Sequence, residues 1–316
     1  GYITRKIQLT PTAGVSQTIE VSLKKNEPPT ETVQSVSPAM PDTLKSQDGH
    51  ILRLVKPGAT LAMGASRREA GRRANENRRL VQFQRPFYFA EKEVSNRDYR
   101  LFSPGHDSGQ LDGVSLNTDP QPVVNISWDD AARYCNWLSS REGLPAAYSE
   151  KDGKMFAVEP MTSGYRLPTE AEWAWVARRL GQNSELRYPW AGPYPPVSVH
   201  GNYADSRFSD TLADVVPNYD DGFRGTAPVG SFPASAGGIY DIGGNVSEWI
   251  HDYYALYPGE GTRLVTDPLG PATGGHHVVR GASWRHGSIT ELRLSYRDYS
   301  NKPRPDLGFR LARYAE

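Results

Sequence analysis

Apolar and polar residues alternate with a period of two near the amino end of the chain. The apolar residues in this pattern are Ile3, Ile7, Leu9, Ile19, Val21 and Leu23. A turn sequence, Pro11-Thr12-Ala13-Gly14, divides them into two runs. Alternation interrupted by a turn is typical of a hairpin. We therefore predict a β-hairpin over residues 1–25, which needs a larger sheet because an isolated hairpin is only marginally stable in water.

The pattern is lost over residues 26–48, where Pro, Ser, Thr and Glu replace most apolar side chains. This composition is typical of a linker. We therefore predict a linker over residues 26–48 and one folded domain over residues 49–316.

Helical periodicity occurs in two places in that domain. The first helix is predicted after Ser127, a favourable N-cap residue, with apolar residues at helical spacing up to Gly143. The second is predicted after Pro168, where Thr169 and Glu172 have the spacing of a capping box, and it ends near Gly181. The rest consists of short strands and turns rich in Gly, Pro and aromatic residues. We therefore expect an α+β fold with two main helices and little regular secondary structure.

Composition removes several classes of function. The 316 residues contain 36 Lys plus Arg and 36 Asp plus Glu, and this zero net charge argues against a nucleic-acid-binding protein. No apolar run approaches the ~18 residues of a membrane span. Cys135 is the only cysteine, which excludes an intramolecular disulfide, a cysteine-based zinc site and two-cysteine redox chemistry.

A series of strings occurs in the order found in one known family. The most specific is Tyr165-Arg166-Leu167-Pro168-Thr169-Glu170-Ala171-Glu172-Trp173. The other strings lie at residues 54–64, 87–96, 122–138, 188–190, 202–205, 225–233, 244–249, 280–284 and 308–312. Together they resemble the formylglycine-generating enzyme, or sulfatase-modifying factor, family over about residues 49–313. The resemblance implies a C-type-lectin-like fold.

The predicted hairpin resembles the end of a PEGA domain, a small β module of bacterial envelope proteins. This second resemblance implies a periplasmic or cell-surface location. The first residues contain no charged-then-apolar signal segment.

The known chemistry of the family depends on a pair of thiols. Members that make formylglycine resemble copper oxidases with two cysteines just after the Gly-Ser-aromatic segment, and thiolates suit Cu(I). In this chain His286 and Glu291 occupy those two positions. Cys135 lies among apolar helix residues, where a small buried side chain is the simpler interpretation. We therefore predict no copper and no formylglycine formation.

A metal-dependent oxidase with other ligands is the main alternative. An iron-dependent branch of the family resembles this domain but uses histidines of a helical domain, and the first histidine here is His50. His276, His277 and His286 form the remaining candidate set. Because adjacent strand residues point to opposite faces, exposed loop histidines are the preferred interpretation.

The resemblance also implies two structural calcium sites. The first would use Asn202, Tyr203, Asp221 and Phe223, and the second would use Asp241, Gly244, Val246 and Glu248. These positions offer side-chain and carbonyl oxygens, and Ca²⁺ prefers six to eight oxygen ligands. The alternative is that these Asn and Asp residues form only turn hydrogen bonds.

Two stretches are candidates for recognition. Aromatic and guanidinium groups gather at Trp284, Arg285, His286, Arg293, Tyr296, Arg297 and Tyr299. They predict a ligand surface, with structural bracing as the alternative. Six arginines over residues 67–79 would attract an acidic partner or form a solvated loop.

These observations lead to one functional expectation. We expect a non-catalytic, calcium-stabilised domain that binds a protein or another ligand in the bacterial cell envelope, without nucleic acid and without a membrane span. A diversified ligand-display protein is the third alternative, because related C-type-lectin-like domains of variable bacterial and phage proteins present ligands from this carboxyl-terminal stretch.

Overall fold

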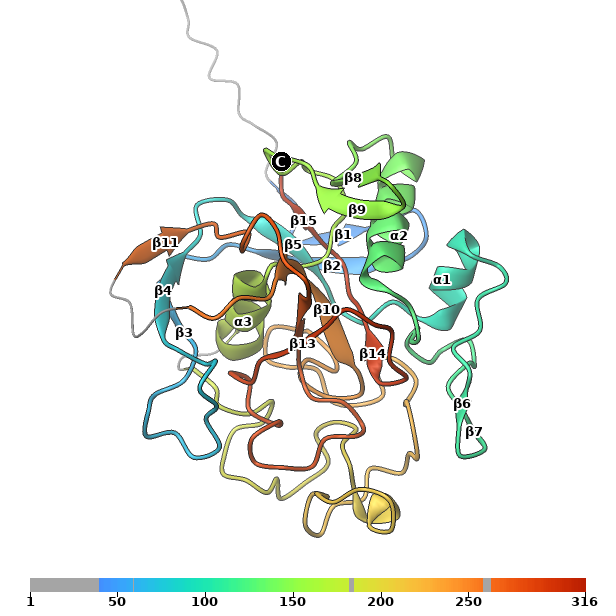
Figure 1. Cartoon of the computed structure of the whole chain (residues 1–316), viewed down its shortest axis with the longest axis vertical. Coiled ribbons are helices and arrows are strands. Elements are labelled where there is room, and N and C mark those ends of the chain that lie inside the picture. Colours follow the sequence, from blue (N-terminus) through green and yellow to red (C-terminus); the bar gives the residue numbers. More distant parts are fainter. Residues whose placement is uncertain (1–39, 59, 182–184, 258–262) are drawn as a thin grey trace, which may run out of the picture. The chain divides into compact units, whose positions relative to one another are not determined.

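The computed structural model describes residues 40–316 except 59, 182–184 and 258–262 (Figure 1). The predicted hairpin at residues 1–25 and most of the predicted linker lie outside the described residues. The compact unit begins at Met40.

One four-stranded antiparallel sheet joins the two ends of this unit. Its order is β1-β2-β5-β15, formed by Thr43–Lys45, Ile51–Val55, Phe87–Ala90 and Ala312–Tyr314. Strand β1 falls inside the stretch 26–48 that the composition predicts as a linker. That boundary is therefore corrected, because Thr43 pairs with Arg53 and Leu44 packs against the hydrophobic core.

A second four-stranded sheet lies at the centre of the unit (Figure 1). Its order is β13-β12-β10-β14, formed by Asp298–Ser300, His277–Arg280, Ser247–Tyr253 and Leu307–Gly308. Strand β10 runs antiparallel to β12 and parallel to β14. All four residues of β12 are buried, so this sheet is part of the core.

The remaining strands form three smaller sheets. Strand β4 (Arg79–Gln82) lies between β3 (Leu61–Met63) and β11 (Leu264–Thr266). Two hairpins stand alone: β6-β7, formed by Gln110–Leu111 and Val114–Ser115, and β8-β9, formed by Tyr148–Lys151 and Lys154–Ala157.

The two predicted helices are present. Helix α2 (Trp128–Arg141) begins after the N-cap Ser127, and α3 (Glu170–Arg179) begins after Thr169, each with a complete capping box. The structure adds a third helix, α1 (Asn96–Phe102), and a 3₁₀ turn at Ser206–Phe208. Thus the predicted α+β fold with short strands is confirmed, with one more short helix.

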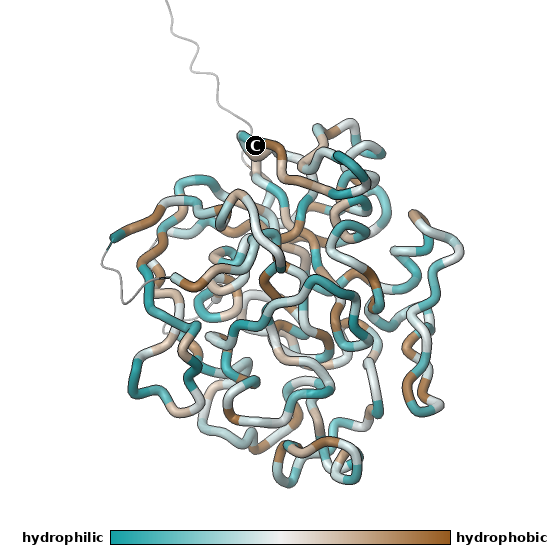
Figure 2. Tube along the Cα trace, in the orientation of Figure 1, coloured by the Kyte–Doolittle hydropathy of each residue, from teal (hydrophilic) through white to brown (hydrophobic). Residues whose placement is uncertain are grey.

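Polar and apolar residues are mixed along most of the chain (Figure 2). Among the described residues no helix is both long enough and apolar enough to cross a membrane. Buried ion pairs hold the loops between the helices and strands. Among the residues that the structure describes, five arginines are almost fully buried: Arg166, Arg280, Arg293, Arg297 and Arg310.

Candidate metal and ligand sites

The two positions that the resemblance assigns to the family's cysteine pair, His286 and Glu291, carry side chains that support local turns. The backbone N–H of Ser283 donates a hydrogen bond to His286 Nδ1 at 3.0 Å, and Ser283 Oγ donates to Asp306 at 3.0 Å. Ser288 Oγ donates to Glu291 Oε2 at 2.9 Å. These contacts give both residues a structural role.

Cys135 lies elsewhere, on α2. It belongs to the main hydrophobic cluster, whereas Trp284, next to the cysteine-pair positions, belongs to a separate cluster. Cys135 is fully buried, and burial raises the pKa of its thiol far above the usual range. The thiolate that copper chemistry requires is therefore disfavoured at this position.

The first predicted calcium site contains one side-chain oxygen without a hydrogen-bond partner among the described residues. Asn202 is fully buried, and its Nδ2 donates to Gly225 O at 2.7 Å and to Asn245 Oδ1 at 3.1 Å. Its Oδ1 has no hydrogen-bond partner. Because an unpartnered buried oxygen is costly, this atom fits a cation ligand.

Asp221 forms turn hydrogen bonds, as the alternative to a calcium site predicts. Its two oxygens accept the backbone N–H groups of Tyr203 at 2.9 Å and Phe223 at 3.0 Å. Burial raises the pKa of Asp221 to about 7. The structure therefore brings Asp221, Tyr203 and Phe223 together through hydrogen bonds that do not require a metal.

The second predicted site contains an acidic pair. Asp241 Oδ2 accepts the backbone N–H of Gly230 at 2.6 Å, and Asp241 Oδ1 has no partner. Neither carboxylate oxygen of Glu93 accepts a hydrogen bond from a backbone or basic group of any described residue, and the Asp241 carboxyl lies within interacting reach of it. Burial, and then the nearby charge of Asp241, raises the pKa of Glu93, and burial also raises the pKa of Asp241. Two adjacent buried acids fit a hard cation such as Ca²⁺.

Glu93 was missed by the reasoning from sequence. It lies in the string Glu93-Val94-Ser95-Asn96, which carries the family resemblance but has no metal-ligand spacing of its own. Its proximity to Asp241 depends on packing between segments almost 150 positions apart in the chain, and no local pattern encodes that contact.

Glu248, a predicted ligand of the second site, is already engaged. Arg310 donates two hydrogen bonds to its carboxylate at 2.7 and 2.8 Å, and Trp173 Nε1 donates a third at 2.9 Å. Val246 is buried in the cluster of Trp284, while Gly244 N donates to Asp241 O at 3.0 Å. The part of the chain that the structure describes contains no group of three His, Cys, Asp or Glu side chains placed to hold a metal. A calcium ion would therefore need carbonyl and amide oxygens as well.

The candidate histidine site is wrong. His276 contacts the ring of Tyr299, His277 stacks on Trp128, and His286 accepts the Ser283 N–H. The three side chains have separate partners and do not converge on one point. His277 is also buried, so the expectation of exposed loop histidines is wrong for that residue.

The predicted ligand surface is only partly exposed. Trp284, Arg293, Tyr296 and Arg297 have at most 5% of their surface accessible. Arg285 is exposed, His286 is half-buried and Tyr299 is 46% exposed. For the four buried residues the surface prediction is wrong, and the bracing alternative describes them.

Ion pairs offset the cost of burying the charges of Arg293 and Arg297. Arg293 donates two hydrogen bonds of 2.6 Å to Glu76, and Arg297 Nη2 donates to Glu170 at 2.9 Å. Glu170 opens α3 and also receives Arg79 at 3.2 Å. Arg72 donates to Asn77 Oδ1 at 2.8 Å and Arg73 donates to the Tyr296 hydroxyl at 3.3 Å, so three arginines of the basic stretch 67–79 are used internally. Arg68 and Arg78 in the same stretch are exposed, as the solvated-loop alternative expects.

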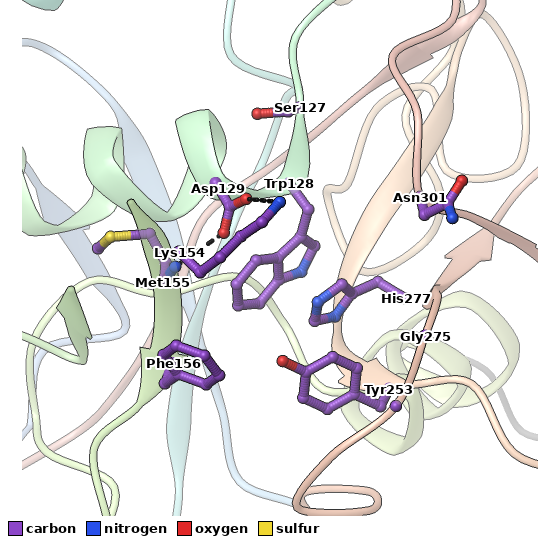
Figure 3. A pocket seen from close by; sticks show the side chains of 11 residues that line it. Ser127, Trp128, Asp129, Lys154, Met155, Phe156, Tyr253, Gly275, His277 and Asn301 are labelled. Atoms are coloured by element: carbon purple, nitrogen blue, oxygen red, sulfur yellow. Dashed lines mark hydrogen bonds and ion pairs between the residues drawn. The ribbon is translucent and has the colours of Figure 1, made fainter. Parts of the chain in front are cut away.

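A hollow that the sequence did not indicate opens between α2, β9, β10 and β12 (Figure 3). It measures about 400 Å³. Trp128 forms part of its wall together with His277, Tyr253 and Phe156. Its residues come from five separate stretches of chain, so no contiguous motif could have marked it.

The fold and these sites define a domain of the formylglycine-generating-enzyme type that lacks thiols at the two oxidase positions. Residues 39–315 match the family described as "Sulfatase-modifying factor enzyme 1-like domain", and the chain belongs to this family. The predicted resemblance is thereby confirmed.

Individual relatives are similar over part of their length. The chain is 32% identical over 174 residues to the formylglycine-generating enzyme of Bos taurus, covering 55% of this chain and 37% of that protein. It is also 32% identical over 164 residues to the "Inactive C-alpha-formylglycine-generating enzyme 2" of Mus musculus, covering 52% and 37%. The chain thus spans less than half the length of these relatives.

A solved structure supports the fold. Treponema denticola variable protein 1 superposes with a TM-score of 0.67 at 22% identity, covering 86% of this chain and 98% of that one. At this identity the likeness concerns the fold alone.

Proposed function

We propose that this chain is a non-catalytic member of the family that acts as a binding or assembly component of the bacterial cell envelope. The observation that carries the proposal is that Cys135 is the only cysteine and is fully buried, while His286 and Glu291 stand where the resemblance places the oxidase cysteines. Cu(I) oxidase chemistry needs accessible thiolates. The similarity to an inactive mouse relative supports this interpretation.

A structural calcium ion is the second part of the proposal. Glu93 and Asp241 form a buried acidic pair with three oxygens that accept no hydrogen bond from a backbone or basic group of the described residues, and Asn202 Oδ1 has no hydrogen-bond partner among them. Ca²⁺ would neutralise the pair and join loops that have few backbone ladder hydrogen bonds. The Glu93 oxygens add a ligand to the set Asp241, Gly244 and Val246.

The test combines an activity assay with metal analysis. Purified protein is supplied with copper(I), oxygen and a cysteine-containing sulfatase peptide, and the peptide is followed by mass spectrometry. We expect no formylglycine, and we expect calcium as the only stoichiometric metal. Peptide oxidation, or stoichiometric iron or copper, would instead establish the oxidase alternative.

A further inference from the structure

The hollow shown in Figure 3 is separate from the sites described above. None of the candidate calcium ligands and neither oxidase position lines it. Its volume of about 400 Å³ falls in the range of small-molecule sites. A ligand in this hollow would rest on the proposed function, because it would give the binding domain a ligand class and a place where that ligand binds.

One wall of the hollow is a rigid stack of three rings. The His277 ring lies 3.7 Å from the Trp128 ring and 4.1 Å from the Tyr253 ring. Trp128 is fixed further because its Nε1 donates to Ile250 O at 2.8 Å. Burial lowers the pKa of His277 to about 4, so this wall is uncharged at neutral pH.

The opposite wall offers a free aromatic face. Phe156, on β9, is 38% exposed, and its ring contacts no other ring in the described part of the chain. Figure 3 shows Phe156 and Tyr253 on opposite sides of the hollow, below Trp128. A flat, C–H-rich group inserted there would pack on Phe156 and the edge of Tyr253.

Polar groups without internal partners surround the same space. The Tyr253 hydroxyl and the Asn301 side-chain amide form no hydrogen bond with any described residue, and both line the hollow. Of the described residues that line this first hollow, only Asp129 and Lys154 are charged, and they pair with each other at 3.3 Å. The hollow therefore presents donors and acceptors without net charge, which disfavours an anion or a cation as the ligand.

A smaller hollow of about 60 Å³ continues from the first and shares Trp128, Phe156 and Tyr253 with it. Its remaining lining includes the apolar residues Ala157, Leu269, Pro271 and Ala272, together with Gly270, His251 and the exposed side chain of Glu159. Such a space suits a small substituent with a methyl group on the main ligand.

We propose that this pair of hollows binds a neutral sugar ring that carries a small substituent ending in a methyl group, such as an acetamido group. A pyranose ring has a C–H face that packs on aromatic rings, while the hydroxyls at its edge both donate and accept hydrogen bonds. Phe156 supplies the face, Tyr253 and Asn301 supply the polar partners, and the smaller hollow accepts the acetamido methyl. The site needs none of the candidate calcium ligands.

The test measures binding of defined glycans to the full chain. Methyl glycosides of N-acetylglucosamine, N-acetylgalactosamine and glucose are titrated and followed by saturation-transfer NMR, with a glycan array and a peptide array in parallel. The variants are Phe156→Ala, Phe156→Tyr and Tyr253→Phe. Leu256→Ala, at an exposed residue outside both hollows, is the matched control.

We expect an N-acetylated glycoside to bind more tightly than glucose, with affinity at least about tenfold weaker in Phe156→Ala. Phe156→Tyr and Leu256→Ala should bind as the unmodified protein does. Tyr253→Phe, which keeps the ring and removes the hydroxyl, should bind more weakly even if Phe156→Ala proves too unstable to measure.

Three results would overturn the proposal. The first is that no glycan binds. The second is that Phe156→Ala and Tyr253→Phe both bind glycans as tightly as the unmodified protein. The third is that only peptides on the array bind, and that their binding depends on Phe156. The last would identify a peptide groove instead. Each leaves the proposed function standing, because that function depends on the peptide-oxidation assay and the metal content.

Discussion

At the scale of single residues, burial decides what each predicted side chain does. The sequence predicts Arg293 and Arg297 as part of a ligand surface because exposed arginines recognise ligands. In the structure each is paired with a buried glutamate. Residue type alone cannot separate these two roles, since both use the same guanidinium group. The identity of the residues at positions 286 and 291 needs no structure, so loss of the cysteine pair is predictable from the sequence.

The buried carboxyl of Asp221 predicts a pH dependence. Its folded-state pKa is raised from 3.8 to about 7, so the folded protein retains a proton that the unfolded chain releases. Between these values the stability from this group therefore falls as pH rises. In chelator, unfolding midpoints of the unmodified protein should fall relative to Asp221→Asn as pH rises from about 4 to about 7. A constant difference between the two proteins would contradict the raised pKa.

At the scale of elements, local signals determine what could be predicted. Helices α2 and α3 have capping residues, an apolar face and a glycine after their last turn, and all of these are visible in the sequence. Helix α1 also has a capping box, between Ser95 and Asp98, but its seven residues are too few to show a period. Strand β1 is held by its pairing with β2 and needs no local pattern of apolar residues. Its composition therefore resembles that of a linker.

The cap of α3 gives a prediction about helix stability. Thr169 accepts the N–H of Glu172, and the Glu172 carboxylate accepts the N–H of Thr169 while it also pairs with Arg166. Thr169→Ala should lower the free energy of unfolding by about 1 kcal/mol in denaturant titration. Ser140→Ala, at an exposed position within α2, is the control and should have almost no effect. Equal losses in both variants would mean that the cap contributes nothing.

At the scale of the whole molecule, buried ion pairs connect segments far apart in the chain. Arg310 joins Glu248 of β10 and also donates to the carbonyls of Ala90 and Glu91 at 3.2 Å. Arg293 similarly joins Glu76, more than 200 positions away. The family resemblance predicted the fold that these contacts build, but periodicity and composition give no information about such long-range pairs.

Removing one partner of such an ion pair should lower the free energy of unfolding more than replacing both partners with apolar residues. Arg310→Met leaves the carboxylate of Glu248 buried without its cation and should cost about 3–5 kcal/mol of unfolding free energy. The double variant Arg310→Met with Glu248→Leu should be more stable than Arg310→Met alone, because no buried charge remains unpaired. Denaturant titration of the four proteins of this cycle measures the coupling, and simple additivity would contradict it.

The sheet β1-β2-β5-β15 also determines how this domain can be joined to other chains. Its two edge strands are the first and last strands of the folded unit, so the chain enters and leaves through one sheet. Three strand spacings separate these edges, which is about 14 Å. A unit with ends this close can be inserted into a surface loop of a host protein without a long spacer. It can also be circularly permuted by a short bridge between the two edges, with new termini placed in the exposed turn at Asp152-Gly153.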